Sequence, residues 1–428
     1  MTTPAMLFHN ASQTVTCAGP ARARRGAEMN DCGVRVGTGV LMEGGTIRAV
    51  DDDSALRAAY PHAQTVDCRG GVLTPGFVDS HTHAIFGRPR FEEQELRATG
   101  IPYMEIANRG GGIHASVRDL RTRDETTLFE LARPRLRSLA THGVTTVEVK
   151  SGYGLTLADE LKTLRIARGL AEQLPMRVVP TWLGAHEIPV EYRDRANGRR
   201  EYVDLLVNDM LPEIAANKLA RFADVFCEPG VFTIDESRTI LTAARAAGLG
   251  IKLHADELTS GGGAELAGEL RATSADHLAA ISDAGIAALA HAGTVATLLP
   301  GTMLFLGKSA QAPARRLIDA NVAVALATDF NPGTSPTTNF PLILTLGVSQ
   351  LRLSVAEAMI AATVNGAAAL GLADRVGQLA PGFSADLALW DVGDVRELPY
   401  WYGTMRCRAS WARGKPCHAQ DLGLTFSP

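Results

Sequence analysis

The sequence of 428 residues has few features of a secreted, membrane-embedded or nucleic-acid-binding protein. Its six cysteines are scattered without a C-x-x-C pair, so a disulfide framework is not expected. No apolar run approaches the length of a membrane span, and residues 1–15 lack a basic segment followed by an apolar core. The formal net charge of −4 leaves no basic footprint. We therefore expect a soluble, cytoplasmic protein that binds neither nucleic acid nor membranes.

Eight short apolar runs, separated by helical stretches, occupy the middle of the chain. Near-continuous apolarity is typical of parallel strands buried on both faces. Alternation of eight such strands with helices favours a (β/α)8 barrel of the TIM type, and the alternative is an open doubly wound sheet. The runs comprise residues 76–79, 145–149, 177–183, 223–226, 251–253, 274–276, 294–299 and 322–327.

The two ends of the chain have a different pattern, with short alternating segments between turn residues. We predict that residues 1–72 and 374–428 together form a small β-sandwich domain, and that residues 73–373 form the barrel. Within the barrel, an apolar stripe predicts a helix over residues 159–174, which precedes a proline. Capping boxes at residues 233–236 and 354–357 predict the starts of two further helices.

Two histidines follow the first apolar run, in the segment PGFVDSHTHA. Residues two apart on a strand point to the same side, so His81 and His83 direct both imidazoles to one place. Imidazole is a good ligand for zinc, iron, nickel and copper. The pair therefore indicates half of a metal site.

Polar residues also close most of the later runs, where a barrel places its active site. They are Lys150 with Tyr153, His186, His254 with Glu257, His277 and Asp329. Taken singly, each strand-end histidine is better explained as a capping residue, and Asp329 as a turn residue before Phe-Asn-Pro-Gly. Taken together, His81, His83, His254 and Asp329 favour one zinc or iron ion with an open coordination position.

Several longer motifs carry a family resemblance across roughly residues 70–370. They are YMEIANRGGGI, VEVKSGYGL, LGAHEIP, DVFCEPGVF, LHADEL, SADHL, ATLLPGT and ATDFNPGTSPTTN. These motifs, with H-x-H and the terminal aspartate, resemble the amidohydrolase superfamily and, within it, the imidazolonepropionase family of histidine degradation. KSGYG and ATDFNPG are the more specific ones for substrate.

The resemblance implies an activity, a cofactor and a set of site residues. The implied reaction is hydrolysis of the cyclic amide of 4-imidazolone-5-propanoate to N-formimidoyl-L-glutamate. It implies one zinc or iron ion per chain on His81, His83, His254 and Asp329, and a homodimer. The substrate pocket is expected to be lined by Arg90, Tyr153, His186, Glu257, Asn331, Gly333 and Thr334.

This reaction needs a nucleophilic water, a polarised carbonyl and a proton for the leaving ring nitrogen. We expect Asp329 to accept the proton of the water, and His277 to polarise the carbonyl or shuttle a proton. Glu257 is expected to orient and protonate the ring nitrogen. Arg90 offers a bidentate fork for the propanoate. Lys150 is interpreted as forming an ion pair or a hydrogen bond below the KSGYG loop, and not as a carboxylated lysine that bridges two metals, so a single metal ion is expected.

Two alternatives remain at this point. One is a nucleobase-type deaminase on the same barrel, which would not need the anion-binding residues Arg90 and Tyr153. The other is a non-catalytic relative that acts as an interaction protein, for which lost ligand residues would be expected.

Overall fold

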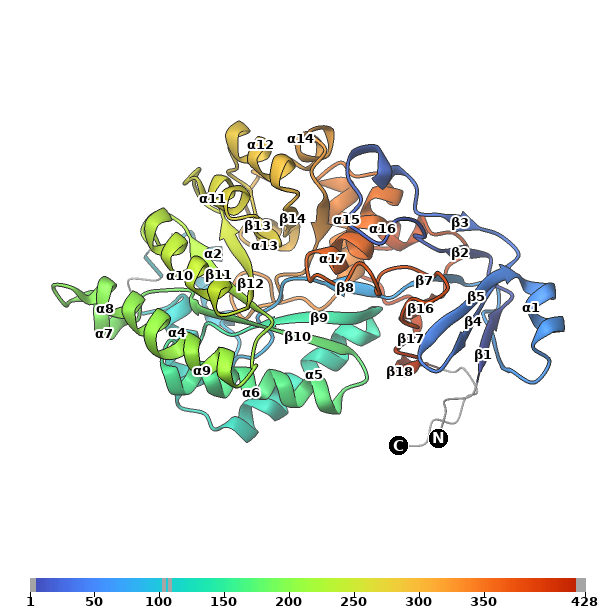
Figure 1. The fold of residues 1–428 in the computed structure, drawn as a ribbon, viewed down its shortest axis with the longest axis horizontal. Coiled ribbons are helices and arrows are strands. Elements are labelled where there is room, and N and C mark those ends of the chain that lie inside the picture. Colours follow the sequence, from blue (N-terminus) through green and yellow to red (C-terminus); the bar gives the residue numbers. More distant parts are fainter. Residues whose placement is uncertain (1–4, 102–104, 107–109, 421–428) are drawn as a thin grey trace.

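The computed structural model describes residues 5–101, 105–106 and 110–420, and its centre is an eight-stranded parallel sheet (Figure 1). Each strand pairs with the next one along the chain, which is the order of a (β/α)8 barrel. All eight predicted runs form these strands. The strands are β8 (Phe77–Asp79), β9 (Val144–Lys150), β10 (Arg177–Ala185), β11 (Phe222–Cys227), β12 (Gly250–Ala255), β13 (Ser274–His277), β14 (Val295–Leu298) and β15 (Val324–Leu326).

The first and last strands meet, which excludes the open sheet. Thr82 and Phe330 form a parallel bridge just beyond β8 and β15. The backbone N–H of Asp329 also donates to the carbonyl of His81 at 3.0 Å. At the same junction, the buried carboxylate of Asp79 accepts hydrogen bonds from the backbone N–H and hydroxyl of Thr328 at 3.0 and 2.6 Å. The predicted barrel is therefore confirmed.

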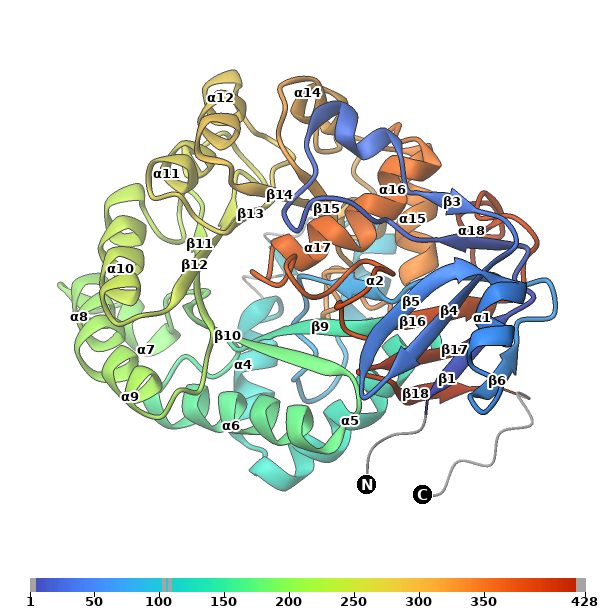
Figure 2. The ribbon, with the colours of Figure 1, turned by 45° about the vertical axis from the view of Figure 1, so that its right-hand side comes forward.

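Helices surround the barrel (Figure 2). The outer elements include α5 (Glu125–Thr141), α6 (Leu157–Gln173), α10 (Ile234–Ala246), α11 (Gly263–Glu269), α12 (Asp283–Ala292), α14 (Ala314–Asp319), α15 (Phe340–Ser349), α16 (Val355–Ala362) and α17 (Val364–Ala368). Shorter elements are α2 (Phe91–Ala98), α4 (Ile113–Arg121), α7 (Val190–Arg193), α8 (Gly198–Leu205), η2 (Leu206–Met210), α9 (Leu211–Ala216) and α13 (Pro300–Phe305).

The predicted helix starts agree with the structure, but one predicted helix is divided. Both capping boxes are present at the starts of α10 and α16. The helix predicted over residues 159–174 begins earlier, because the Thr156 side chain caps it. The helical run after Ser354 separates into α16 and α17 at Thr363, whose φ and ψ of −125° and −85° are not helical.

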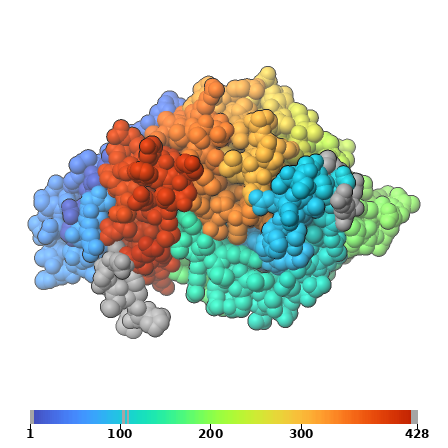
Figure 3. Space-filling view, turned by 180° about the vertical axis from the view of Figure 1, so that it is seen from behind, coloured from blue at the N-terminus to red at the C-terminus, as the bar shows by residue number. Residues whose placement is uncertain are grey.

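Strands from both ends of the chain form two further sheets beside the barrel, and the end segments lie next to each other (Figure 3). Phe8 and Trp411 pack edge to face with ring centroids 4.9 Å apart in the core that these sheets share. The boundaries at residues 72/73 and 373/374 stay a prediction. The four-stranded sheet consists of β5 (Thr46–Asp52), β4 (Thr38–Glu43), β1 (Met6–His9) and β6 (Gln64–Asp67). The six-stranded sheet consists of β18 (Lys415–Ala419), β17 (Cys407–Ala412), β16 (Leu387–Trp390), β7 (Val72–Pro75), β2 (Gln13–Val15) and β3 (Val34–Arg35).

Three short helical elements remain. The first, α1 (Asp53–Ala59), packs on the four-stranded sheet, whereas η1 (Gly26–Asn30) packs against α14 and α16, and α18 (Glu397–Tyr400) packs against α15. Part of the YMEIANRGGGI motif, at residues 103–104 and 107–109, lies outside the described residues. Within the described part of the chain, every helix is too short or too polar to cross a membrane.

Candidate metal centre and active site

Four predicted metal ligands meet at the carboxyl ends of the barrel strands. His81 and His83 follow β8, His254 lies near the end of β12, and Asp329 follows β15. The Nε2 atoms of His81 and His83 lie 3.5 and 3.6 Å from Asp329 Oδ1. The rings of His81 and His254 have centroids 4.5 Å apart. All four side chains are buried, so the barrel brings together groups that are up to 248 positions apart in sequence.

The nitrogens that face one another in this cluster fit a bound metal ion. His81 Nε2 and His254 Nε2 are both buried and have no hydrogen-bond partner among the described residues. Buried polar atoms nearly always have a hydrogen-bond partner or bind a metal ion. Two buried nitrogens without a partner, close to the Asp329 carboxylate, therefore indicate a binding site for a metal ion. Three imidazoles and one carboxylate form a donor set suited to zinc or iron.

Burial and neighbouring charged groups set the protonation of the histidines. Burial lowers the pKa of His81 and His83 well below the ordinary value, and Lys150 beside His81 and His186 beside His83 lower it further. These two imidazoles are therefore neutral and present lone pairs. For His254, burial also disfavours the charged form, but the adjacent Asp224 carboxylate outweighs it and raises the pKa.

Asp329 is oriented by a partner that the sequence did not reveal. The hydroxyl of Thr302, in α13, donates to Asp329 Oδ2 at 2.6 Å. This bond leaves Oδ1 facing the histidines. Burial raises the pKa of the carboxyl, and His277 opposes that shift.

The predicted proton-transfer residues lie together at the edge of the cluster. His277 Nδ1 and Glu257 Oε2 are 3.7 Å apart. Burial, reinforced by Glu228, raises the pKa of Glu257 to about 7, whereas burial lowers the pKa of His277 to about 4. Glu228 also accepts backbone hydrogen bonds from Glu257 at 3.2 Å and from Thr259 at 2.8 Å. Its place in the motif DVFCEPGVF was the only sequence signal for this role.

An aromatic wall adjoins the ligand His83. Its ring stacks on His186 with centroids 5.0 Å apart and planes inclined by 15°. The Tyr153 ring lies 5.8 Å from His83 and 5.5 Å from His186. Gly152 makes this approach possible, because its φ is +106° and a Cβ there would lie 2.8 Å from His186 Nδ1. The structure thus brings both predicted pocket residues beside a predicted metal ligand.

Arg90 lies against the loop that follows Asp329. Its backbone N–H donates to the carbonyl of Pro332 at 3.0 Å, and a Cβ at Gly333 would overlap its guanidinium. Glu93 Oε2 lies 3.6 Å from Arg90 Nε. The side-chain oxygen of Asn331 accepts from the backbone N–H groups of Gly333 and Thr334, both at 2.8 Å. The amide of Asn331 is therefore used within its own loop, which holds Gly333 against Arg90.

Lys150 forms the buried ion pair that its sequence position indicated. Its Nζ lies 2.7 Å from Asp224 Oδ2 and 2.8 Å from Glu148 Oε2. Burial opposes the charged form, but the neighbouring carboxylates outweigh it and raise the pKa. These partners were not predicted from the sequence, although Glu148 and Asp224 are charged residues within strands β9 and β11.

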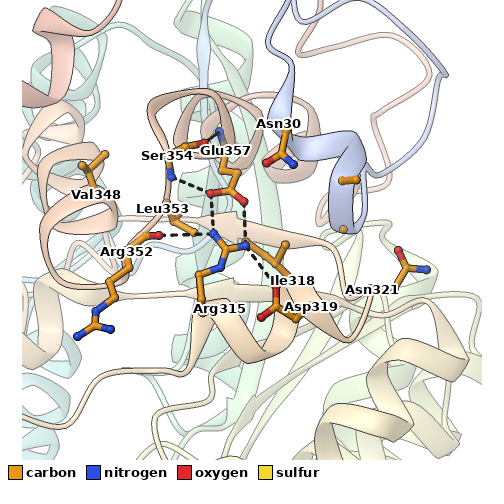
Figure 4. Close-up of a pocket in the computed structure, with 12 residues that line it drawn as sticks. Asn30, Arg315, Ile318, Asp319, Asn321, Val348, Arg352, Leu353, Ser354 and Glu357 are labelled. Atoms are coloured by element: carbon orange, nitrogen blue, oxygen red, sulfur yellow. Dashed lines mark hydrogen bonds and ion pairs between the residues drawn. The ribbon is translucent and has the colours of Figure 1, made fainter.

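A separate hollow of about 880 Å³ lies between η1, α14 and the start of α16 (Figure 4). There Arg315 pairs with both oxygens of Glu357 at 2.8 and 2.9 Å and lies 3.7 Å from Asp319. The lining includes none of the metal-cluster residues. The candidate active site is therefore the histidine cluster.

Known proteins share this architecture. The structure resembles a zinc-bound adenosine deaminase from Xanthomonas campestris, with a TM-score of 0.73 and 19% identity over 99% of this chain and 94% of that one. A triazine hydrolase variant gives a TM-score of 0.76 at 17% identity, over 99% and 96% of the two chains. At these identities the likeness concerns the fold.

Sequence comparison is more specific. Residues 104–418 match the model of the amidohydrolase family, and residues 39–63 match that of the bacterial imidazolonepropionase-like composite domain. The imidazolonepropionase of Geobacillus kaustophilus is 45% identical over 96% of this chain and 97% of its own length. That of Symbiobacterium thermophilum is 49% identical over 93% of both chains. The chain therefore belongs to the amidohydrolase family and, within it, to the imidazolonepropionases.

Proposed function

We propose that this chain hydrolyses the ring amide of 4-imidazolone-5-propanoate to N-formimidoyl-L-glutamate in histidine degradation. The observation that carries the proposal is the buried cluster of His81, His83, His254 and Asp329, with a cationic side chain, Arg90, at the neighbouring loop. The relatives named imidazolonepropionase support the substrate.

The four cluster residues would hold one zinc or iron ion. When bound, such an ion supplies Lewis acidity, which polarises a carbonyl and makes water more acidic. Zinc in the adenosine deaminase of the same fold supports zinc, and the donor set also suits iron. Metal analysis of the purified protein decides between them.

The side chains around the cluster would move the protons. Asp329 accepts a proton from the attacking water, whose oxygen forms a bond to the ring carbonyl carbon. The carbon–nitrogen bond then breaks, and Glu257 donates a proton to the leaving nitrogen. A protonated Glu257 is available near neutral pH because burial raises its pKa to about 7. His277, 3.7 Å from Glu257, polarises the carbonyl or passes the proton onward.

Arg90 would bind the propanoate of the substrate. Its guanidinium can form two parallel hydrogen bonds with a carboxylate. Tyr153 and His186 complete the pocket wall, and Gly333 leaves room for the guanidinium. Thr334 would contribute a hydroxyl, while Asn331 keeps the loop in place.

The cellular setting follows from the same proposal. We place the enzyme in the cytoplasm, which fits six cysteines that are all free. A small molecule is its substrate, and neither nucleic acid nor membrane is part of its action. Pairing into a homodimer stays a prediction.

The proposal is tested by supplying metal-replete protein with 4-imidazolone-5-propanoate. We expect loss of the ultraviolet absorbance of the substrate and formation of N-formimidoyl-L-glutamate. No turnover of this substrate, together with deamination of a nucleobase, would favour the deaminase alternative.

A further inference from the structure

A network of five charged residues lies inside the barrel, next to the metal cluster. Its members are Glu148, Lys150, Asp224, Lys252 and Asp276, each no more than 1% exposed. Glu148 Oε2 is shared by both lysines, with Nζ of each at 2.8 Å. Lys150 and Lys252 also approach Asp276 Oδ2, at 3.6 and 3.5 Å. Every charged group here thus has an opposite charge beside it.

Two carboxylates of this network contact predicted metal ligands on the side away from the metal position. Asp276 Oδ2 lies 2.7 Å from Nδ1 of His81. Asp224 Oδ2 lies 3.0 Å from Nδ1 of His254, and its Oδ1 accepts from the backbone N–H of His254 at 3.1 Å. The Nε2 atom of each ring has no hydrogen-bond partner among the described residues. The contact of His254 Nδ1 with Asp224 is an ion-pair distance and not a fully aligned hydrogen bond, so Asp224 holds His254 mainly through its backbone N–H and its charge.

Each carboxylate is fixed from a second direction. Asp276 Oδ1 accepts from the hydroxyl of Ser274 at 2.6 Å, and Asp224 Oδ2 accepts from Lys150 at 2.7 Å. A carboxylate held in this way accepts a hydrogen bond from Nδ1–H and leaves the Nε2 lone pair free for a metal. His83 differs, because its buried Nδ1 has neither a hydrogen-bond partner nor an ion pair with a carboxylate among the described residues.

We propose that Asp276 and Asp224 are positioning residues that fix the metal-binding tautomers of His81 and His254, with Lys150 and Lys252 as the basic partners of the network. The inference rests on the metal ligands of the proposed function. Formally, two ammonium groups against three carboxylates leave one negative charge in the network. Lys150 contacts both Asp224 and Asp276. The same charged network therefore orients both ligand histidines, His81 and His254.

The test measures metal affinity directly. Asp276→Asn and Asp224→Asn each replace an oxygen with an N–H donor that opposes the required tautomer. We expect zinc affinity, measured by competition with a chelating dye, to fall about 10- to 100-fold in each variant. The visible spectrum of the cobalt-substituted protein should change as well. Asp386→Asn is the matched control, because Asp386 is buried in the sheets beside the barrel and contacts Ser384 and Arg413.

A charge-balanced variant keeps the test valid if a single substitution prevents folding. Asp276→Asn combined with Lys252→Met retains the formal charge of the network and should still bind zinc weakly. Wild-type affinity and cobalt spectrum in any folded Asp276→Asn or Asp224→Asn variant would overturn the inference and leave the proposed function intact. Wild-type protein that binds no metal would instead overturn the metal assignment itself.

Discussion

At the scale of single residues, burial determines which groups can donate and accept protons. It is the largest influence on Glu257 and His277, and it moves their pKa values in opposite directions, to about 7 and about 4. The carboxyl group thereby becomes a proton donor near neutral pH, and the imidazole stays neutral.

Glu257→Gln tests this shift through stability. Between pH 4.5 and about 7 the unfolded chain releases the proton of Glu257, whereas the folded protein keeps it. The free energy of unfolding of the wild type therefore falls as the pH rises through this range, and it stays lower above pH 7. We expect metal-free Glu257→Gln to be more stable than metal-free wild type at pH 8, by up to about 3 kcal/mol, and similar at pH 4.5. Urea unfolding at both values measures this.

The exposed Glu172→Gln serves as the control for charge removal and should show no such gain. An equal effect of Glu257→Gln at the two pH values would contradict the raised pKa.

Arg90→Ala tests the substrate contact. Loss of the two hydrogen bonds from Arg90 to the substrate carboxylate should raise KM about 10- to 100-fold and leave kcat nearly unchanged, because the methylene groups of the propanoate separate this carboxylate from the ring amide. Steady-state kinetics with 4-imidazolone-5-propanoate give both constants. Arg88→Ala is the matched control, since Arg88 is exposed and pairs with Glu92 at 3.4 Å. An unchanged KM in Arg90→Ala would contradict the assignment.

At the scale of elements, the strand ends explain how much the sequence could reveal. The strands were predictable because they are buried on both faces, and most of them, such as β14 and β15, are therefore mainly apolar. Asp329 and His254 could be recognised because each terminates such a run. The partners Thr302 and Asp276 could not, because their contacts depend on how helix α13 and strand β13 are placed in space. Likewise, the break at Thr363 has no clear signal in an apolar run.

The position of Tyr153 depends on the backbone conformation of the KSGYG loop after β9. Glu160 Oε1 accepts from the backbone N–H groups of Gly152, Gly154 and Leu155 at 3.1, 2.9 and 3.0 Å. This buried carboxylate shapes the KSGYG loop and so places Tyr153 beside His186.

Gly152→Ala should disturb this loop. A Cβ at φ +106° is strained and would lie 2.8 Å from His186 Nδ1, so His186 and Tyr153 must move. We expect kcat/KM to fall at least about tenfold while the far-ultraviolet circular dichroism stays that of wild type. Gly248→Ala is the control, because Gly248 has a positive φ of +89° but no neighbouring atom within 4 Å of its Cβ. Equal kinetics in both variants would contradict the proposed role of the loop.

At the scale of the whole molecule, the barrel is an apolar structure built around a few charged groups. Lys150 and Lys252 are among the largest fully buried side chains, and they lie between β9, β11, β12 and β13. The sheets formed by the chain ends pack beside this barrel, where Ser384 and Asp386 contact Arg177 at the start of β10. The catalytic groups lie at the other, carboxyl ends of the strands.

Lys150→Met should therefore destabilise the entire barrel. Without Lys150, Asp224 loses its lysine partner and the three buried carboxylates face Lys252 alone, and such an uncompensated buried charge costs about 3–5 kcal/mol. Urea denaturation measures the loss, with the exposed Lys415→Met as the control. A change below about 1 kcal/mol in Lys150→Met would show that the ion pair contributes little.

The central claim is that one metal ion on His81, His83, His254 and Asp329 supports hydrolysis of an imidazolone ring. Its most direct test is to strip the protein with a chelator, add back zinc or iron, and follow turnover of 4-imidazolone-5-propanoate. We expect no activity without metal and a linear rise in activity that ends at one equivalent per chain. Activity in the metal-free protein, or a rise that continues to two equivalents, would contradict it.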